Sequence, residues 1–257
     1  MEDRRFGVQQ NQGAYSTTEK GQATGISADA MNVLRNTYML LGMTLAFSAL
    51  TAFLNMNGTH PGFLITIVGY IGLLFATYKL KNSPWGIVTT FALTGFMGFT
   101  LGPIIGQMVA AGASQIVANA LALTATAFVG LSATAIITKK DFSFLSSFLT
   151  AGAFVLIGAM LLAFFMQSSI LHLAVSAGFT IFASIMILFE TSRIINGGER
   201  NYIIATVGLY VAIYNLFVSL LHLMMAFSGD TDRLGIIQMT GNCQRTPTSV
   251  GVFSFMR

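Results

Sequence analysis

Long runs of apolar residues, separated by short polar connections, divide most of this chain into hydrophobic segments. A helix needs about 20 apolar residues to cross the hydrocarbon core of a bilayer. The runs are continuous and do not alternate as the strands of a membrane barrel do, so helices are expected. The pattern predicts seven membrane-spanning helices, at residues 37–56, 62–78, 86–110, 115–137, 144–166, 170–192 and 203–228.

Short connections between these runs predict that consecutive helices pack as antiparallel neighbours. The expected fold is all-α, a polytopic membrane protein whose seven-transmembrane helical bundle spans residues 31–228. Residues 1–30 are polar and predict a disordered cytoplasmic tail. Residues 229–257 are polar and irregular, and fit either an exoplasmic tail or a frame-altered end of the gene.

Composition supports a chain that lies in a lipid bilayer. Hydrophobic residues make up 54% of the sequence and charged residues 9%, whereas soluble domains carry about 25% charged residues. Basic residues do not cluster with aromatic ones, which argues against a nucleic-acid partner. The motifs of zinc proteases, serine hydrolases and P-loop proteins are missing from the sequence. We therefore expect neither an enzyme nor a cofactor.

Basic residues occupy every second connection between the predicted helices. The first, third and fifth connections contain no lysine or arginine. Because cytoplasmic loops are enriched in these residues, the N-terminus is predicted in the cytoplasm and, with seven spans, the C-terminus outside. Six spans would leave basic residues on the wrong side. The basic residues of the second, fourth and sixth connections are Lys79, Lys81, Lys139, Lys140, Arg193 and Arg200.

Glu190 is the one acidic residue that the pattern places inside a hydrophobic helix. In the stretch ILFETSRIINGGERNYI it lies one to two turns from the cytoplasmic end. Arg193 follows three residues later, and Lys79 ends the second helix on the same side. A carboxylate within a membrane helix is costly, which makes these three residues candidates for pH or ion sensing. The alternative interpretation is a salt-bridged helix end whose charges reach the interface.

The third hydrophobic helix carries glycines at a spacing of four, in the stretch TGFMGFTLGPIIGQ. Gly98, Gly102 and Gly106 therefore share one face and permit close approach of another helix. Pro103 removes one backbone hydrogen bond and is expected to kink the helix. Packing and a hinge are the two interpretations of this face.

The last helix carries polar side chains near the membrane midplane. These are Tyr210, Tyr214 and Asn215, and the asparagine is expected to bond across to another helix. Three histidines, at positions 60, 172 and 222, fall toward the outer side of the membrane. Their spacing matches no metal-ligand motif, so no metal site is predicted.

Several motifs together resemble the Bax inhibitor-1 family, and more closely its bacterial YccA branch. The resemblance covers about residues 31–228 and implies a seven-helix fold whose last helix is central, surrounded by the other six. The motifs that carry it are VLRNTY, TYKLKNSPWGI, TGFMGFTLGPII, TKKDFSFL, LHLAVSAGF, ILFETSRIINGGERNYI and ATVGLYVAIYNLFVSLL.

The resemblance implies a bacterial inner-membrane protein that binds the membrane AAA protease FtsH and modulates it. Inhibition of FtsH would protect membrane substrates such as SecY subunits from degradation. An AAA protease must grip an unstructured cytoplasmic segment, and the tail of residues 1–30 fits that description.

The alternative function implied by the resemblance is a pH-sensitive calcium or cation leak, gated by two acidic residues on the last two helices. Glu190 matches the first of these residues, whereas the second corresponds to Ala212. A single carboxylate cannot share a proton with a partner, which is what raises an apparent pKa into a sensing range. This departure favours the protease modulator over the calcium leak.

Overall fold

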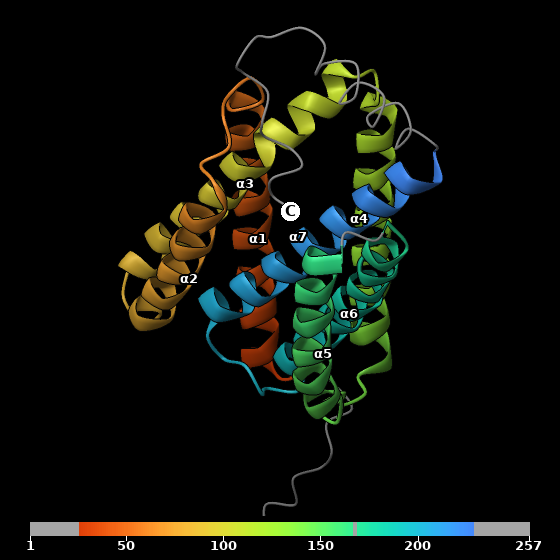
Figure 1. Cartoon of the computed structure of the whole chain (residues 1–257). Helices are drawn as coiled ribbons and strands as arrows, with labels where there is room; N and C mark the ends of the chain where they lie inside the picture. Colours follow the sequence, from red (N-terminus) through yellow and green to blue (C-terminus); the bar gives the residue numbers. More distant parts are fainter. Residues whose placement is uncertain (1–25, 167–168, 229–257) are drawn as a thin grey trace, which may run out of the picture.

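A computed structural model describes residues 26–166 and 169–228 of the chain, and this part contains seven α-helices (Figure 1). Short connections link the helices, as the pattern predicts. Their bounds are α1 (Ala28–Leu54), α2 (Phe63–Leu80), α3 (Trp85–Ala110), α4 (Ser114–Thr138), α5 (Leu145–Met166), α6 (Ser169–Ile195) and α7 (Tyr202–Phe227).

The first helix begins nine residues earlier than its apolar run predicts, at Ala28 instead of residue 37. The Ser27 side chain caps this helix by accepting a hydrogen bond from the backbone amide of Ala30 at 3.2 Å. Asp29 lies in the first turn, where a negative charge favours a helix start. Residues 28–30, assigned to the tail, are therefore helical. Residues 1–25 and 229–257 lie outside the described residues.

Six of these helices are long and apolar enough to cross a membrane, namely α1, α3, α4, α5, α6 and α7. The apolar part of α2 is shorter, at Leu64–Leu80. The chain is thus a multi-pass membrane protein with an all-helical fold. Whether α2 also spans the bilayer stays a prediction.

The last helix is the most buried element among these candidate spans. In the most apolar stretch of α7, 67% is buried inside the bundle, compared with 6% in that of α5. Helices α1, α3, α4 and α6 pack against it, while α2 packs mainly on α3 and α5 on α6. Figure 1 accordingly shows α2 at the edge of the bundle. Four helices rather than six form the main surroundings of α7.

A face of small residues lets α1 and α3 approach closely. A Cβ atom added at Gly102 would lie 2.5 Å from the carbonyl oxygen of Ala52, and one at Gly98 would also meet backbone of α1, at Ser48. A Cβ atom at Gly106 would meet the backbone of Met56, just beyond the end of α1. Larger side chains on this face would force the two helices apart.

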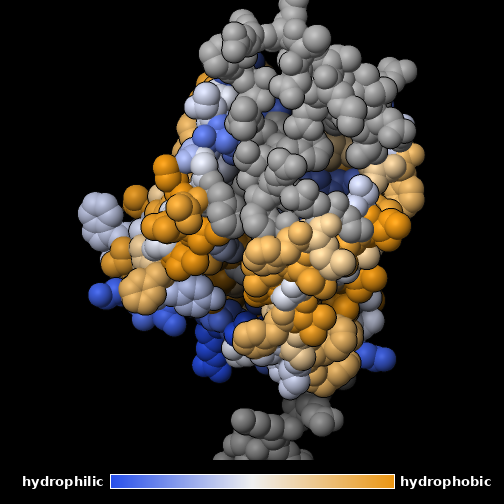
Figure 2. All heavy atoms as spheres, viewed as in Figure 1, coloured by the Kyte–Doolittle hydropathy of each residue, from blue (hydrophilic) through white to orange (hydrophobic). Residues whose placement is uncertain are grey.

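Three connections with basic residues meet at one end of the bundle. The Asn201 amide before α7 donates to the Lys81 carbonyl at 3.0 Å, and the Ser192 hydroxyl of α6 donates to the Lys140 carbonyl at 2.9 Å. We call this the basic end, defined by residues 79–84, 139–144 and 193–201. A cavity of about 330 Å³ between Ser27 and Arg200 places the start of α1 there too. Figure 2 shows hydrophilic residues gathered at this lower end.

Pro103 interrupts the backbone ladder of α3 without ending the helix. Because proline has no amide hydrogen, the Phe99 carbonyl four residues earlier loses its usual helical donor. The side chain of Asn55, at the end of α1, supplies a replacement: its Nδ2 donates to the Phe99 oxygen at 2.8 Å. The polar residue at the end of one helix thus compensates for the proline in its neighbour.

This arrangement predicts that the effect of replacing Asn55 depends on Pro103. Asn55→Ala should lower the free energy of unfolding by about 1 kcal/mol, because the Phe99 carbonyl loses its donor. In a Pro103→Ala background the alanine amide can bond that carbonyl, so the same change should have a smaller effect. Thermal unfolding in mild detergent measures both.

Asn119→Ala is a matched control, since Asn119 is exposed on α4 and its side chain accepts a hydrogen bond from Gln115 of its own helix. An Asn55→Ala effect of equal size in both backgrounds would contradict the compensation.

Candidate functional site

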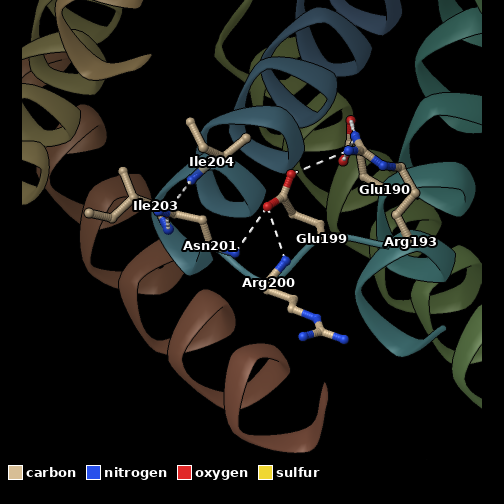
Figure 3. Close-up of polar contacts among 7 residues, drawn as sticks. All are labelled: Glu190, Arg193, Glu199, Arg200, Asn201, Ile203 and Ile204. Atoms are coloured by element: carbon tan, nitrogen blue, oxygen red, sulfur yellow. Dashed lines mark hydrogen bonds and ion pairs between the residues drawn. The ribbon is translucent and has the colours of Figure 1, made fainter. Parts of the chain in front are cut away.

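Glu190 lies near the end of α6 at the basic end and is only 8% exposed. Both of its carboxylate oxygens are 3.4 Å from Nη1 of Arg193, one turn later on the same helix. Nη2 of Arg193 lies 3.2 Å from Glu199, beyond the end of α6. One guanidinium therefore bridges two carboxylates, as Figure 3 shows.

A glycine turn at the end of α6 brings Glu199 back toward Arg193. Gly197 has φ of +74°, a left-handed conformation that glycine adopts readily. The Gly198 amide donates to the Arg193 carbonyl at 2.8 Å and the Gly197 amide to Ile194 at 3.2 Å. These two bonds form a Schellman motif, which ends α6 and reverses the chain.

Glu199 and Asn201 extend this ion network to the start of α7. The second oxygen of Glu199 accepts from the backbone amides of Arg200 at 3.0 Å and Asn201 at 2.9 Å. The Asn201 side chain caps α7 by accepting from the amides of Ile203 and Ile204 (Figure 3). Its amide group also reaches Lys81 and Asn82, so the network connects α6, α7 and the α2–α3 connection.

The Glu190 carboxylate packs against the backbone of α7. A Cβ atom added at Gly208 would lie 3.0 Å from the carboxyl carbon of Glu190, so a larger residue would require the carboxylate to shift. The Arg193 guanidinium lies 5.5 Å from the centre of the Phe189 ring, within range of a cation–π contact. The ion pair is therefore held between packed surfaces rather than in open solvent.

Ala212 lies one helical turn beyond Gly208 on the same face of α7 and is fully buried. It belongs to an apolar cluster with Ile187, Leu209 and Leu216. The position that would carry a second acidic residue is therefore filled by a methyl group in an apolar interface. The charged partner of Glu190 is therefore Arg193 of its own helix, and not a carboxylate on α7.

Lys79 does not join this network, contrary to the grouping expected from the sequence. It is exposed in the last turn of α2, and in the part of the chain that the structure describes it forms no ion pair with Glu190. Arg193 reaches the carboxylate from the same helix at a spacing of three residues, which is ideal for a helical pair. Glu199 takes the place expected for the lysine, as a second partner of Arg193.

The sequence analysis did not identify Glu199, Asn201 or Gly208 as parts of this site. The paired glycines before Glu199 were the available signal, because a helix that ends in Gly-Gly can turn its next side chain back onto its last turn. Gly208 gave no such signal, since a single glycine in a membrane helix is common.

Tyr210 is buried at the centre of the bundle, where its hydroxyl joins three helices. It donates to the Thr94 carbonyl of α3 at 3.1 Å and pairs with the Ser48 hydroxyl of α1 at 2.7 Å. Tyr214 stacks on it with ring centres 6.2 Å apart. Asn215 differs from expectation: its Nδ2 donates to the Val211 carbonyl of its own helix at 2.9 Å, not to another helix.

Metal-binding side chains do not gather in the described part of the chain, where no group of three histidine, cysteine, aspartate or glutamate residues could hold an ion. The Glu190 network provides two carboxylates already occupied by one guanidinium and two backbone amides. The described residues of this network do not form the pair of a nucleophile and a base that covalent catalysis uses.

Comparison with known proteins shows the family to which this chain belongs. The family model described as "Inhibitor of apoptosis-promoting Bax1" matches residues 30–229, nearly all of the described bundle. The chain belongs to the Bax inhibitor-1 family. The match includes every helix from α1 to α7 except the first residues of α1.

Bacterial members of the Bax inhibitor-1 family are similar over most of this chain. The Escherichia coli protein named "Modulator of FtsH protease YccA" is 50% identical over 77% of this chain and 91% of its own length. An uncharacterized protein of Pseudomonas aeruginosa is 54% identical over 79% of this chain and 92% of its own length. An uncharacterized membrane protein of Vibrio cholerae is 46% identical over 75% of this chain and 88% of its own length.

We predict that the folded bundle tolerates the charge of Glu190 because Arg193 pairs with it. Arg193→Gln should lower the free energy of unfolding by about 2 kcal/mol, less than for a fully buried pair because the arginine side chain is 32% exposed. Adding Glu190→Gln removes the unpaired charge and should restore most of this loss. Thermal unfolding of the two variants in mild detergent measures the difference.

Arg200→Gln serves as the control, because Arg200 is exposed in the same turn and should contribute little. A double variant that is less stable than Arg193→Gln would show that Glu190 does not rely on this cation.

Proposed function

We propose that this protein is a bacterial inner-membrane protein that binds the membrane AAA protease FtsH and inhibits it, so that membrane substrates are protected from degradation. One observation carries the proposal: the relative named as a modulator of that protease is 50% identical and is matched over 91% of its length. Such coverage extends over most of both chains and is not limited to a single motif.

The form of the bundle supports an interaction protein. Its polar groups serve to hold helices together, as with Tyr210 and the Glu190 network, and no catalytic arrangement is found among the described residues. Meanwhile α2 and α5 offer long apolar faces at the edge of the bundle. Faces of this kind can contact lipid or the helices of another membrane protein.

The proposal includes the topology. All seven helices span the membrane, with the basic end and the N-terminus in the cytoplasm and the C-terminus outside. The gathering of Lys81, Lys140 and Arg200 at one end of the bundle supports it, since cytoplasmic loops are enriched in basic residues. The proposal also includes the tail of residues 1–30 as the segment that the protease grips.

We do not extend the proposal to a calcium leak. That function needs a second acidic residue facing Glu190, and the corresponding position holds the buried Ala212. Glu190 instead forms an ion pair with Arg193 of its own helix and packs against Gly208 of α7.

Two measurements in the same cells test the proposal: whether FtsH co-purifies with this protein, and whether the lifetime of an FtsH substrate changes. The tagged protein, purified in mild detergent from cells that co-express FtsH, should retain the protease, and the lifetime of SecY in those cells should increase. An unrelated multi-pass protein, expressed at the same level with the same tag, should retain none and leave the SecY lifetime unchanged.

Absence of FtsH from the purified protein, together with an unchanged SecY lifetime, would refute the proposed function. Retention of FtsH with a shortened SecY lifetime would show binding with activation and would refute inhibition.

A further inference from the structure

A groove lies between α5 and α6 on the outside of the bundle. It has a volume of about 430 Å³, and apolar side chains such as Phe154, Phe182 and Phe189 line most of it. Ser146 and Thr150 line the part nearest the start of α5. The adjoining surface of α5 is mostly hydrophobic (Figure 2), so the groove opens toward the lipid side of the bundle.

The length of the groove matches one leaflet of a bilayer. Along α5 it extends from Ser146 to Ile157, which corresponds to about 17 Å at the helical rise of 1.5 Å per residue. Half of the hydrocarbon core measures about 15 Å. A membrane helix of a partner would need a matching surface along the full core, about 30 Å long. An acyl chain of one leaflet fits the groove better than a helix.

Basic residues lie at the end of the groove where its hydroxyl groups are found. The α6 residues that line it, Phe182, Met186 and Phe189, share one face, and the next residue on that face is Arg193. Lys140 is exposed in the α4–α5 connection, and its carbonyl accepts hydrogen bonds from Ser192 and Asn196 at the end of α6. These bonds hold the connection over the end of α6.

Asp141 is the acidic side chain next to this lysine. It accepts hydrogen bonds from the hydroxyl and the backbone amide of Ser143, which lower its pKa and keep the carboxylate turned onto its own connection. The carboxylates of Glu190 and Glu199 are both directed at Arg193. Lys140 is the exposed cation that these acidic groups do not engage in the described contacts.

We propose that the groove between α5 and α6 binds one anionic phospholipid, with an acyl chain along Phe154, Phe182 and Phe189 and the headgroup phosphate beside Lys140 and the hydroxyl of Ser146. Apolar pockets between membrane helices with basic residues at the cytoplasmic side are typical sites for anionic headgroups. The inference does not depend on the association with FtsH.

Native mass spectrometry of the full-length protein in mild detergent tests the site. Phosphatidylglycerol and phosphatidylcholine with identical acyl chains are supplied at equal concentration, and the retained lipids are counted. The wild type should retain phosphatidylglycerol in preference. Lys140→Gln should lower that preference about fivefold, the ratio that corresponds to about 1 kcal/mol for one basic residue at the membrane surface. Lys81→Gln, at an exposed lysine of the α2–α3 connection instead of the α4–α5 connection, should not change it.

A second pair of variants tests the acyl chain. Ala153 lines the groove, whereas Ala151 is exposed two residues earlier, on the opposite face of α5. Ala153→Trp should fill the groove and lower the retention of both lipids, and Ala151→Trp should retain them as the wild type does.

Equal headgroup preference in Lys140→Gln and Lys81→Gln would overturn the proposal, as would equal lipid retention in the two tryptophan variants. Loss of FtsH from Ala153→Trp with unchanged lipid retention would identify a partner helix as the occupant and would also overturn it.

Discussion

The hydrogen bonds of the Tyr210 hydroxyl hold three helices, α1, α3 and α7, together inside the bundle. A hydroxyl buried away from water must find a partner within the protein, because an unsatisfied polar group in an apolar interior is costly. Tyr210 finds two, the Ser48 hydroxyl of α1 and the Thr94 carbonyl of α3. Because the hydrophobic effect does not drive helices together in lipid, such directional bonds and close packing determine which helices are neighbours.

Further contacts join the other helices to α7, the most buried of the candidate spans. Glycines of α3 bring α1 close enough for Ser48 to meet the tyrosine, and Gly208 of α7 leaves room for the Glu190 carboxylate of α6. At the basic end, Arg193 and Asn201 connect α6 to α7 and to the α2–α3 connection. The helices that take least part in these contacts, α2 and α5, offer their apolar faces to lipid or to a partner.

The apolar runs were sufficient to predict seven helices, because a membrane helix must be apolar along most of its length. Both ends of six helices lie within three residues of the predicted positions. The start of α1 was missed because Asn32, Arg35 and Asn36 are polar, whereas a helix outside the apolar region is held by its cap at Ser27. Apolar patterning reports the part of a helix within lipid and not its full length.

The candidate site was predicted only in part. Glu190 and Arg193 are three residues apart, so their pairing follows from helical spacing. Glu199 reaches Arg193 through a left-handed turn at Gly197, and Gly208 meets Glu190 through packing of separate helices, which spacing along the chain does not specify. The partner of Asn215 was wrongly predicted for the same reason, because it depends on the rotation of the helix. The pH- or ion-sensing role of Lys79 stays a prediction.

The stability of Tyr210→Phe tests most directly the claim that this hydroxyl organises the bundle. Compared with Tyr78→Phe, a control at an exposed tyrosine of α2, it should lower the free energy of unfolding in mild detergent by about 1 to 2 kcal/mol, because Ser48 loses its partner. Equal stability of the two variants would contradict the claim.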